Sequence, residues 1–197
     1  MADRPYHHGN LRAVLLAQAE ETLRDQGLEG LSLRELARQT GVSHGAPRRH
    51  FADRQALLDA LAESGFARLG AELRGAAESA GEGYEPRLRA TATAYVRFAI
   101  RDAALLELMF AGKQHEQAGA LHEAADRAFS VILKLIEEGQ SNAALEPGDP
   151  EHIGLLLFAT MQGLAALVTA GIVAPEQVDS LVGDATARFL HGPRLPA

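Results

Sequence analysis

The stretch LSLRELARQTGVSHGAPRRHFADR runs from Leu31 to Arg54 and sets the architecture of the N-terminal part of the chain. It contains five arginines and two histidines, whereas its only acidic residues are Glu35 and Asp53. The chain as a whole has 197 residues and a formal net charge of −7. Positive charge is therefore gathered in one short window of an acidic protein, and the residue spacing indicates why.

The spacing predicts a short helix, a tight turn and a second short helix. Ser32 and Glu35 are placed as a capping box, which begins a helix that ends near residue 39. Gly41 can adopt a turn conformation that is costly for other residues. Ser43 can then cap a third helix of the N-terminal part, over 43–51.

A helix, a tight turn and a helix form the arrangement that places a second helix in the major groove of DNA. Arginine pairs with phosphates or guanine edges, and phosphate contacts supply much of the affinity. Arg54 is expected in the first turn of the next helix, where backbone N–H groups can also bind a phosphate. The predicted DNA-binding residues are Ser32, Ser43, His44, Arg48, Arg49, His50 and Arg54.

The rest of the chain is predicted to be helical, with no convincing strand. Apolar residues recur at helical spacing, bounded by caps, glycines and prolines, over 11–26, 54–78, 86–100, 104–110, 121–136, 150–171 and 175–189. The predicted fold class is therefore all-α, with roughly nine helices. We place a helix-turn-helix DNA-binding domain at 1–54, a head of three helices, and a ligand-binding and dimerisation domain at 55–197.

The quoted stretch resembles the DNA-binding head of the TetR-type bacterial transcriptional regulators. The matching elements are the Gly41-Val42-Ser43 turn, His50-Phe51, the basic Arg54 and Leu57-Leu58. The resemblance is specific over residues 10–60 and implies a regulator with a C-terminal effector domain. The segments YVRFAIRDAALLELMFAG and MQGLAALVTAG resemble one subgroup of these effector domains, with Gln162-Gly163 where a His-Gly pair is usual.

Two residues depart from the pattern of that family. Arg48 replaces the usual tyrosine of the recognition helix, a phosphate contact, and an arginine there can hold a phosphate or reach a base. Pro47 lies inside the same short helix, where it removes a backbone donor and crowds the preceding turn. We expect a distorted helix rather than an abolished one, and both departures leave the operator preference open.

Composition and charge restrict the class of protein. The chain has no cysteine, which excludes disulfides, thiolate zinc sites and cysteine nucleophiles and suits a reducing cytosol. Residues 1–54 hold eight arginines and seven acidic residues, whereas the remainder holds 11 basic and 19 acidic residues. Residues 1–12 lack an apolar signal core, and the apolar run 153–170 is interrupted by polar residues and glycines. We therefore expect a soluble cytoplasmic protein without a membrane span.

The second domain is expected to hold a small molecule and a dimer interface. Its apolar helices offer a ligand pocket, although ordinary core packing is the alternative for each residue; the candidates are Tyr95, Phe98, Met109, Phe110, Phe129 and Met161. The helix over 150–171 is apolar almost all round and must be covered on every side. With the last helix it can form half of an intermolecular four-helix bundle, a single internal core being the alternative. The interface candidates are Leu156, Ala159, Gly163, Leu167, Val178, Leu181 and Phe189.

No catalytic or cofactor motif is found. His115, His122 and His152 do not follow a known metal-ligand pattern, so no metal site and no cofactor are expected. His7 and His8 could belong to an arm that touches DNA.

The sequence thus predicts a ligand-responsive transcriptional regulator. As a homodimer it would bind a palindromic DNA operator with half-sites roughly 34–36 Å apart, or a multiple of that distance, and a small-molecule effector would release it. One alternative is an all-α ligand-binding or scaffold dimer that no longer reads DNA, given Arg48 and Pro47; an enzyme is a more distant one. The effector, the operator, the regulated genes and the choice between repressor and activator are not given by the sequence.

Overall fold

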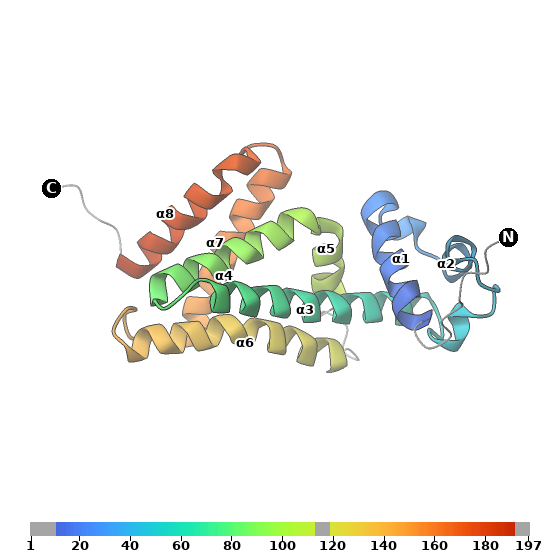
Figure 1. The fold of residues 1–197 in the computed structure, drawn as a ribbon, viewed down its shortest axis with the longest axis horizontal. Coiled ribbons are helices and arrows are strands. Elements are labelled where there is room, and N and C mark those ends of the chain that lie inside the picture. Colours follow the sequence, from blue (N-terminus) through green and yellow to red (C-terminus); the bar gives the residue numbers. More distant parts are fainter. Residues whose placement is uncertain (1–10, 113–118, 192–197) are drawn as a thin grey trace. The chain divides into compact units, whose positions relative to one another are not determined.

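The computed structural model describes residues 11–112 and 119–191. These residues form an all-α structure, as the sequence predicts, and Figure 1 shows the helices in chain order. The α-helices are α1 (Leu11–Gln26), α2 (Leu33–Thr40), α3 (Arg54–Ser79), α4 (Tyr84–Arg101), α5 (Ala103–Gly112), α6 (Gly119–Ser141), α7 (Pro150–Thr169) and α8 (Val178–His191). Short 3₁₀ helices lie at Leu28–Gly30, Pro47–Arg49 and Pro175–Gln177.

The helices pack into two compact units. The first comprises the described residues of 1–65 and 104–121, and the second those of 66–103 and 122–197. The chain passes from one unit to the other within α3, and it returns to the first unit for α5. The domain boundary predicted between residues 54 and 55 divides the chain by expected role. The packing divides it differently, because α5 groups with the N-terminal helices.

In the first unit, α1 packs against α2. Leu15, Ala19 and Leu23 recur at helical spacing on α1 and are fully buried, which is the apolar stripe expected of a core-facing helix. The hydroxyl of Thr22 donates to the side chain of Gln39 at 3.0 Å, a polar tie between the two helices. These contacts fix the position of α2, the first helix of the helix-turn-helix.

In the second unit, α4 packs against both α7 and α8. The part of α3 that belongs to this unit runs beside α6, and the ring centroids of Phe66 and Phe129 lie 6.2 Å apart across the two helices (Figure 1). Tyr95, Val96 and other residues on the inner faces of α4 are buried. The core of this unit therefore lies around α4.

Helix α7 is covered on one face only within a single chain. Leu157 and Met161 are buried, but Leu155, Leu156 and Leu167 are 62%, 48% and 39% exposed. In the part of the chain that the structure describes, α7 is also the one helix long and apolar enough to cross a membrane, by length and composition. A single internal core, the alternative that the sequence left open, does not cover this helix.

Candidate nucleic-acid interface and ligand site

The start of α2 is capped as predicted, but only by half of the expected box. The Oγ of Ser32 accepts a hydrogen bond from the backbone N–H of Glu35 at 3.1 Å. The carboxylate of Glu35 does not return to the backbone of Ser32, because it accepts from Nε of Arg38 at 2.9 Å. That hydrogen bond holds the pKa of Glu35 below its ordinary value. The Ser32 cap alone therefore begins the helix.

The turn after α2 depends on Gly41, as predicted. Its φ of 70° and ψ of 24° lie in the left-handed region, which favours glycine. The next residue, Val42, donates its N–H to the carbonyl of Ala37 at 3.0 Å, which closes the end of α2. The chain is thereby turned sharply into the basic segment.

The predicted third helix over 43–51 is not an α-helix, which corrects the expectation from the sequence. A turn is followed by the 3₁₀ helix Pro47–Arg49. The carbonyl of Ser43 accepts from the N–H of Ala46 at 2.9 Å, because Pro47, the residue that an α-helix would place as donor, has no N–H. The cap predicted for Ser43 is also wrong, since its exposed hydroxyl makes no hydrogen bond with the described residues.

The segment nevertheless presents a basic surface. His44, Arg48, Arg49 and His50 are all exposed. None of the four forms an ion pair or a side-chain hydrogen bond with a described residue, so their donors are available to a ligand. We call these four residues the basic turn. Guanidinium and imidazole groups of this kind suit the phosphates and base edges of a duplex.

Phe51 anchors the end of the basic turn. Its side chain is buried, and the guanidinium carbon of Arg12 lies 5.5 Å from the centroid of its ring. Pro47 is also buried. The two apolar residues hold the segment against the first unit, while the polar side chains between them point away from the core.

Arg54 has partners that sequence reasoning did not foresee. Its Nε donates to the carbonyl of Leu31 at 2.9 Å, and one terminal nitrogen donates to the carbonyl of Leu28. Asp53 caps α3, because its carboxylate accepts from the N–H of Ala56 at 2.8 Å. Arg54 therefore lies in the first turn of the helix, as expected, while the phosphate contact assigned to it stays a prediction.

In the second unit, a row of aromatic rings crosses four helices. The centroid distances are 6.2 Å from Phe66 to Phe129, 5.5 Å from Phe129 to Phe158, and 5.5 Å from Phe158 to Tyr95. The hydroxyl of Tyr95 donates to Oε1 of Gln162 at 2.5 Å, and burial raises the pKa of Tyr95 well above its ordinary value. The row, with its polar end at Tyr95, is a packed aromatic cluster of the second unit.

Sequence reasoning identified only part of this row. It named Tyr95 and Phe129 but missed Phe66, Phe158 and Gln162. Phe66 lies on α3, whereas Phe158 and Gln162 lie one turn apart on α7, so periodicity within a helix gives no signal that they meet the rings of α4 and α6. The departure from the usual His-Gly pair at Gln162 was the one available sign.

The other predicted pocket residues do not join one cluster. Phe98 lies under two arginines, with the guanidinium carbons of Arg68 and Arg101 at 5.2 and 5.5 Å from its ring centroid. Met109 and Phe110 belong to the first unit. Met161 is buried on α7, among the core residues of that helix.

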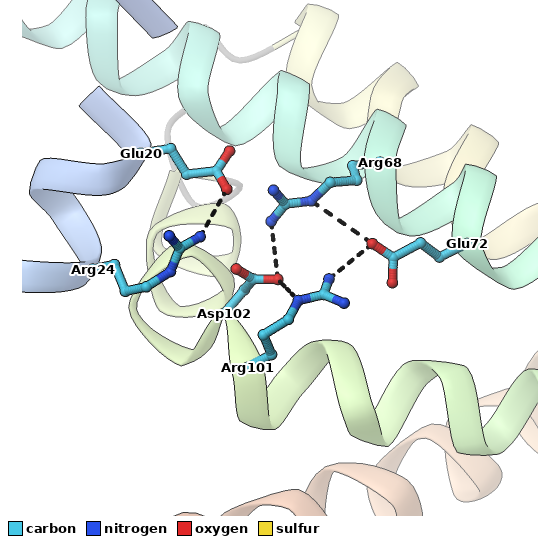
Figure 2. A network of polar contacts seen from close by, with 6 residues as sticks. All are labelled: Glu20, Arg24, Arg68, Glu72, Arg101 and Asp102. Carbon is cyan, nitrogen blue, oxygen red and sulfur yellow. Dashed lines mark hydrogen bonds and ion pairs between the residues drawn. The ribbon is translucent and has the colours of Figure 1, made fainter. Parts of the chain in front are cut away.

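The arginines above Phe98 belong to an ionic cluster of the second unit (Figure 2). Asp102, whose side chain is 1% exposed, lies 2.7 Å from Nε of Arg101 and 3.0 Å from a terminal nitrogen of Arg68. Glu72 pairs with Arg101 at 2.8 Å, and this hydrogen bond raises the pKa of Arg101. Two cations and two anions balance, so the cluster joins α3 to the end of α4 and is not a charged binding site.

Figure 2 also draws an ion pair of the first unit. Glu20 and Arg24 lie one turn apart on α1, with 3.2 Å between the guanidinium nitrogen and the carboxylate oxygen. Pairs of this spacing on a helix surface contribute a few tenths of a kcal/mol, about 0.3–0.5, and this one supports α1 locally.

A groove of about 560 Å³ opens on the second unit. None of the predicted pocket residues lines it. Its walls come from the end of α3, from α4 and from the start of α8, where Arg97 pairs with Asp179 at 2.8 Å. Its lining residues are Ala76, Ser79, Ala80, Pro86, Arg89, Ala90, Thr93, Ala94, Arg97 and Asp179.

No metal centre is found among the residues that the structure describes, where no three His, Asp or Glu side chains gather in a suitable group. His115, together with His7 and His8, lies outside the described ranges. His122 and His152 are described and do not belong to any such group.

Two family models match this chain. Residues 15–61 match the model described as "Bacterial regulatory proteins, tetR family". Residues 88–189, half of the chain, match "Tetracyclin repressor-like, C-terminal domain". The first range contains the helix-turn-helix and the basic turn, and the second contains the aromatic row apart from Phe66.

Individual proteins are also similar to this chain. A protein of unknown function from Rhodococcus sp. RHA1 is 46% identical, and the match covers 98% of this chain and 100% of that one with a TM-score of 0.89. The tetracycline repressor protein class C of Escherichia coli is 47% identical over 53 residues, which are 27% of this chain and 24% of that protein.

A third relative shares the fold at low identity. The transcriptional regulator FadR from Bacillus subtilis, solved in complex with stearoyl-CoA, is 12% identical with a TM-score of 0.74, over 93% of this chain and 100% of that one. The helix-turn-helix, the exposed basic turn and the two matched domains lead to one conclusion. This chain belongs to the TetR family of bacterial transcriptional regulators, DNA-binding proteins that are not enzymes.

Proposed function

We propose that this regulator is a repressor that binds a palindromic operator as a homodimer and is released by a small-molecule effector. The observation that carries the DNA-binding part is the basic turn, whose four side chains are exposed and have no described partner. Arg48 and Arg49 would supply phosphate or base contacts, and Ser32 and Ser43 could add hydroxyl contacts. Occupation of a promoter by such a protein in the cytoplasm would block transcription.

The dimer is supported by the uncovered face of α7. Leu155 and Leu156 are large apolar side chains exposed on a long helix, and the exposure of such an apolar face to water is unfavourable. A second copy of α7 and α8 would cover it in a four-helix bundle with two-fold symmetry. Because the family is soluble, we expect a second copy of the chain, and not a membrane, to cover this face of α7.

The interface proposal keeps six of the seven candidate residues. Four are exposed on α7 and two are partly exposed on α8: Leu156, Ala159, Gly163, Leu167, Leu181 and Phe189. Val178 is only 6% exposed because it packs inside its own chain, so it has almost no surface to offer and is removed from the set.

An effector site in the second unit is supported by the aromatic row. Four rings with a tyrosine hydroxyl and a carboxamide at one end suit an apolar molecule that carries a polar group. The structure of FadR with stearoyl-CoA indicates that a chain of this fold can hold a small molecule with an apolar tail. Helix α3, which runs through both units, would carry the response to the helix-turn-helix.

The DNA-binding proposal is tested with the full chain. Duplexes that the protein retains from a random DNA pool are sequenced, and the Kd of the preferred duplex is measured at several salt concentrations. We expect a palindromic preference and a log–log salt dependence with a slope of about −0.9 per neutralised phosphate. Arg48→Ala and Arg49→Ala should each weaken binding by about tenfold or more, in the range of a lost charged contact.

Arg89→Ala is the matched control, because Arg89 is an exposed arginine of α4 outside the helix-turn-helix. It should leave the Kd nearly unchanged. Unchanged affinity in both Arg48→Ala and Arg49→Ala, or no retained duplex at all, would favour a scaffold dimer that no longer reads DNA.

The effector proposal requires unequal binding to two states. A shift from 1:99 to 99:1 needs a preference of about 5.5 kcal/mol for the released state. The protein–operator complex is titrated at fixed salt with a library of apolar molecules that carry one polar group, stearoyl-CoA included. At least one should raise the Kd for the operator; a library with no such member would contradict the switch.

A further inference from the structure

We infer that Arg54 is a positioning residue of the helix-turn-helix, in place of the phosphate contact that the sequence predicts for it. Arg54 is the first residue of α3, yet its guanidinium reaches the carbonyls of Leu28 and Leu31, which lie 26 and 23 positions earlier in the chain. Those carbonyls belong to the short segment that leads into α2. The side chain thus links the beginning of α3 to the beginning of α2.

The two carbonyls have at most a weak partner within their own segment. Leu31 is extended, with φ −81° and ψ 112°, and it precedes the helix, so its oxygen lies outside the regular ladder of α2. The N–H of Glu35, which could otherwise turn back toward it, donates to Oγ of Ser32 instead. Besides the bond from Arg54, the carbonyl of Leu28 accepts a long bond, 3.3 Å, from the N–H of Leu31. The bond to the carbonyl of Leu31 is partly buried, so leaving that oxygen unpaired would be costly, whereas the bond to the carbonyl of Leu28 is exposed and water could replace it.

The shape of the guanidinium matches this task. Nε and a terminal nitrogen donate in parallel to two acceptors, a fork geometry that is specific to arginine. Lysine carries the same charge but has one nitrogen, so it cannot reproduce both bonds with the same geometry. Glutamine has neither the charge nor the reach.

The nearby arginines present a contrast. Arg48 and Arg49 have no described partner and are free to meet a duplex, whereas the guanidinium of Arg54 is already satisfied on two of its nitrogens. Because α2 precedes the basic turn, fixing its start relative to α3 also fixes where the basic turn is presented. Arg54 therefore contributes to DNA affinity through Ser32 and α2 and not through a phosphate.

The test compares Arg54→Lys, Arg54→Gln and Arg49→Gln in the full-length protein. The Kd for the duplex selected from the random pool is measured at several salt concentrations. Amide hydrogen exchange at 33–36 is followed without DNA. We expect both Arg54 variants to bind about tenfold more weakly, with an unchanged salt slope and faster exchange at the start of α2. Arg49→Gln should lower the slope by about 0.9 and leave that exchange unchanged.

Other outcomes would overturn the assignment. If Arg54→Lys binds like the unmodified protein while Arg54→Gln lowers the slope by about 0.9, Arg54 is a phosphate contact. Unchanged exchange at 33–36 in both variants would likewise contradict a positioning role. The exchange measurement needs no DNA, so it decides the inference even if no duplex is retained, and Arg54→Lys serves if Arg54→Gln fails to fold.

Discussion

At the scale of single residues, the hydroxyl groups of Tyr84 and Tyr95 differ in their hydrogen bonding. The hydroxyl of Tyr84 is buried without a hydrogen-bond partner among the described residues. Burial raises its pKa to about 12, with the charge of Glu138 adding to the effect and that of Arg87 opposing it. Tyr95, by contrast, donates its hydroxyl to Gln162.

The raised pKa of Tyr84 predicts a loss of stability at alkaline pH. The unfolded chain releases this proton near its ordinary pKa of about 10, whereas the folded chain holds it up to about 12. The stability that Tyr84 contributes is therefore complete below pH 10 and declines as the pH rises toward 12. Urea unfolding at pH 8 and pH 11 should show a smaller decline for Tyr84→Phe than for the unmodified protein.

At pH 8 the same two tyrosines give a matched comparison. Tyr84→Phe removes an unpaired buried hydroxyl and should raise the free energy of unfolding by up to about 1 kcal/mol. Tyr95→Phe leaves the carbonyl oxygen of Gln162 without its donor and should lower that free energy by about 1 kcal/mol. Equal effects of the two substitutions would contradict this account of their environments.

Local features of single residues were predictable, and distant ones were not. The Ser32 cap follows from residues three positions apart, so the sequence contains all that it needs. The partners of Arg54 lie more than twenty positions away, and only the folded first unit brings them together. The sequence did indicate a basic side chain at the start of α3, but not which groups that side chain would contact.

At the scale of elements, the turn between α2 and the basic turn depends on backbone conformation alone. Gly41 has a φ of +70°, and an added Cβ would meet no atom within 4 Å. Gly45 also has open space around its Cα, but its φ is not in the left-handed region. Comparing the two glycines therefore isolates the energetic cost of the left-handed backbone conformation, because an added Cβ would meet no atom at either position.

Gly41→Ala is expected to lower the free energy of unfolding by about 1–2 kcal/mol, the cost of the left-handed conformation for alanine. Gly45→Ala should be neutral or slightly stabilising, by up to about 1 kcal/mol, because it restricts the unfolded chain. Denaturant unfolding of both variants measures the difference. Similar values for the two would show that φ at Gly41 is not what sets the turn.

The elements themselves were largely predictable. Long helices carry several repeats of an apolar stripe, and their positions agree with the sequence pattern to within a few residues. The prediction of a helix over 43–51 was wrong, because the short pattern there resembles that of a helix. Pro47 removes the backbone donor that an α-helix needs at this position. The aromatic row could not be predicted, since its rings come from four helices whose mutual packing no single stripe encodes.

At the scale of the whole molecule, helices that follow one another in the sequence do not always pack in the same unit. Helix α5 follows α4 in sequence, yet it groups with α1, α2 and the first part of α3. A boundary drawn along the chain cannot describe a unit assembled from two separate stretches. The shared element is α3, which begins at Arg54 in the first unit and ends at Ser79 in the second.

The exposed face of α7 leads to a prediction about assembly. Leu156 is 48% exposed, and a second copy of the chain would bury it. Leu156→Glu places a charge at that position, which an apolar interface cannot accommodate, so the variant should be monomeric where the unmodified protein is dimeric. Sedimentation velocity at micromolar concentration measures the mass of each.

Val14→Glu is the matched control, because Val14 is 50% exposed on α1, far in the sequence from α7. It should leave the dimer intact. Loss of the dimer separates the two heads that read one palindrome, so Leu156→Glu should also weaken binding to the selected duplex by about 100-fold, while a half-site duplex is bound with little change. A monomeric unmodified protein that instead partitions onto lipid vesicles through α7 would contradict the proposed interface, because the same apolar face would then be covered by a membrane.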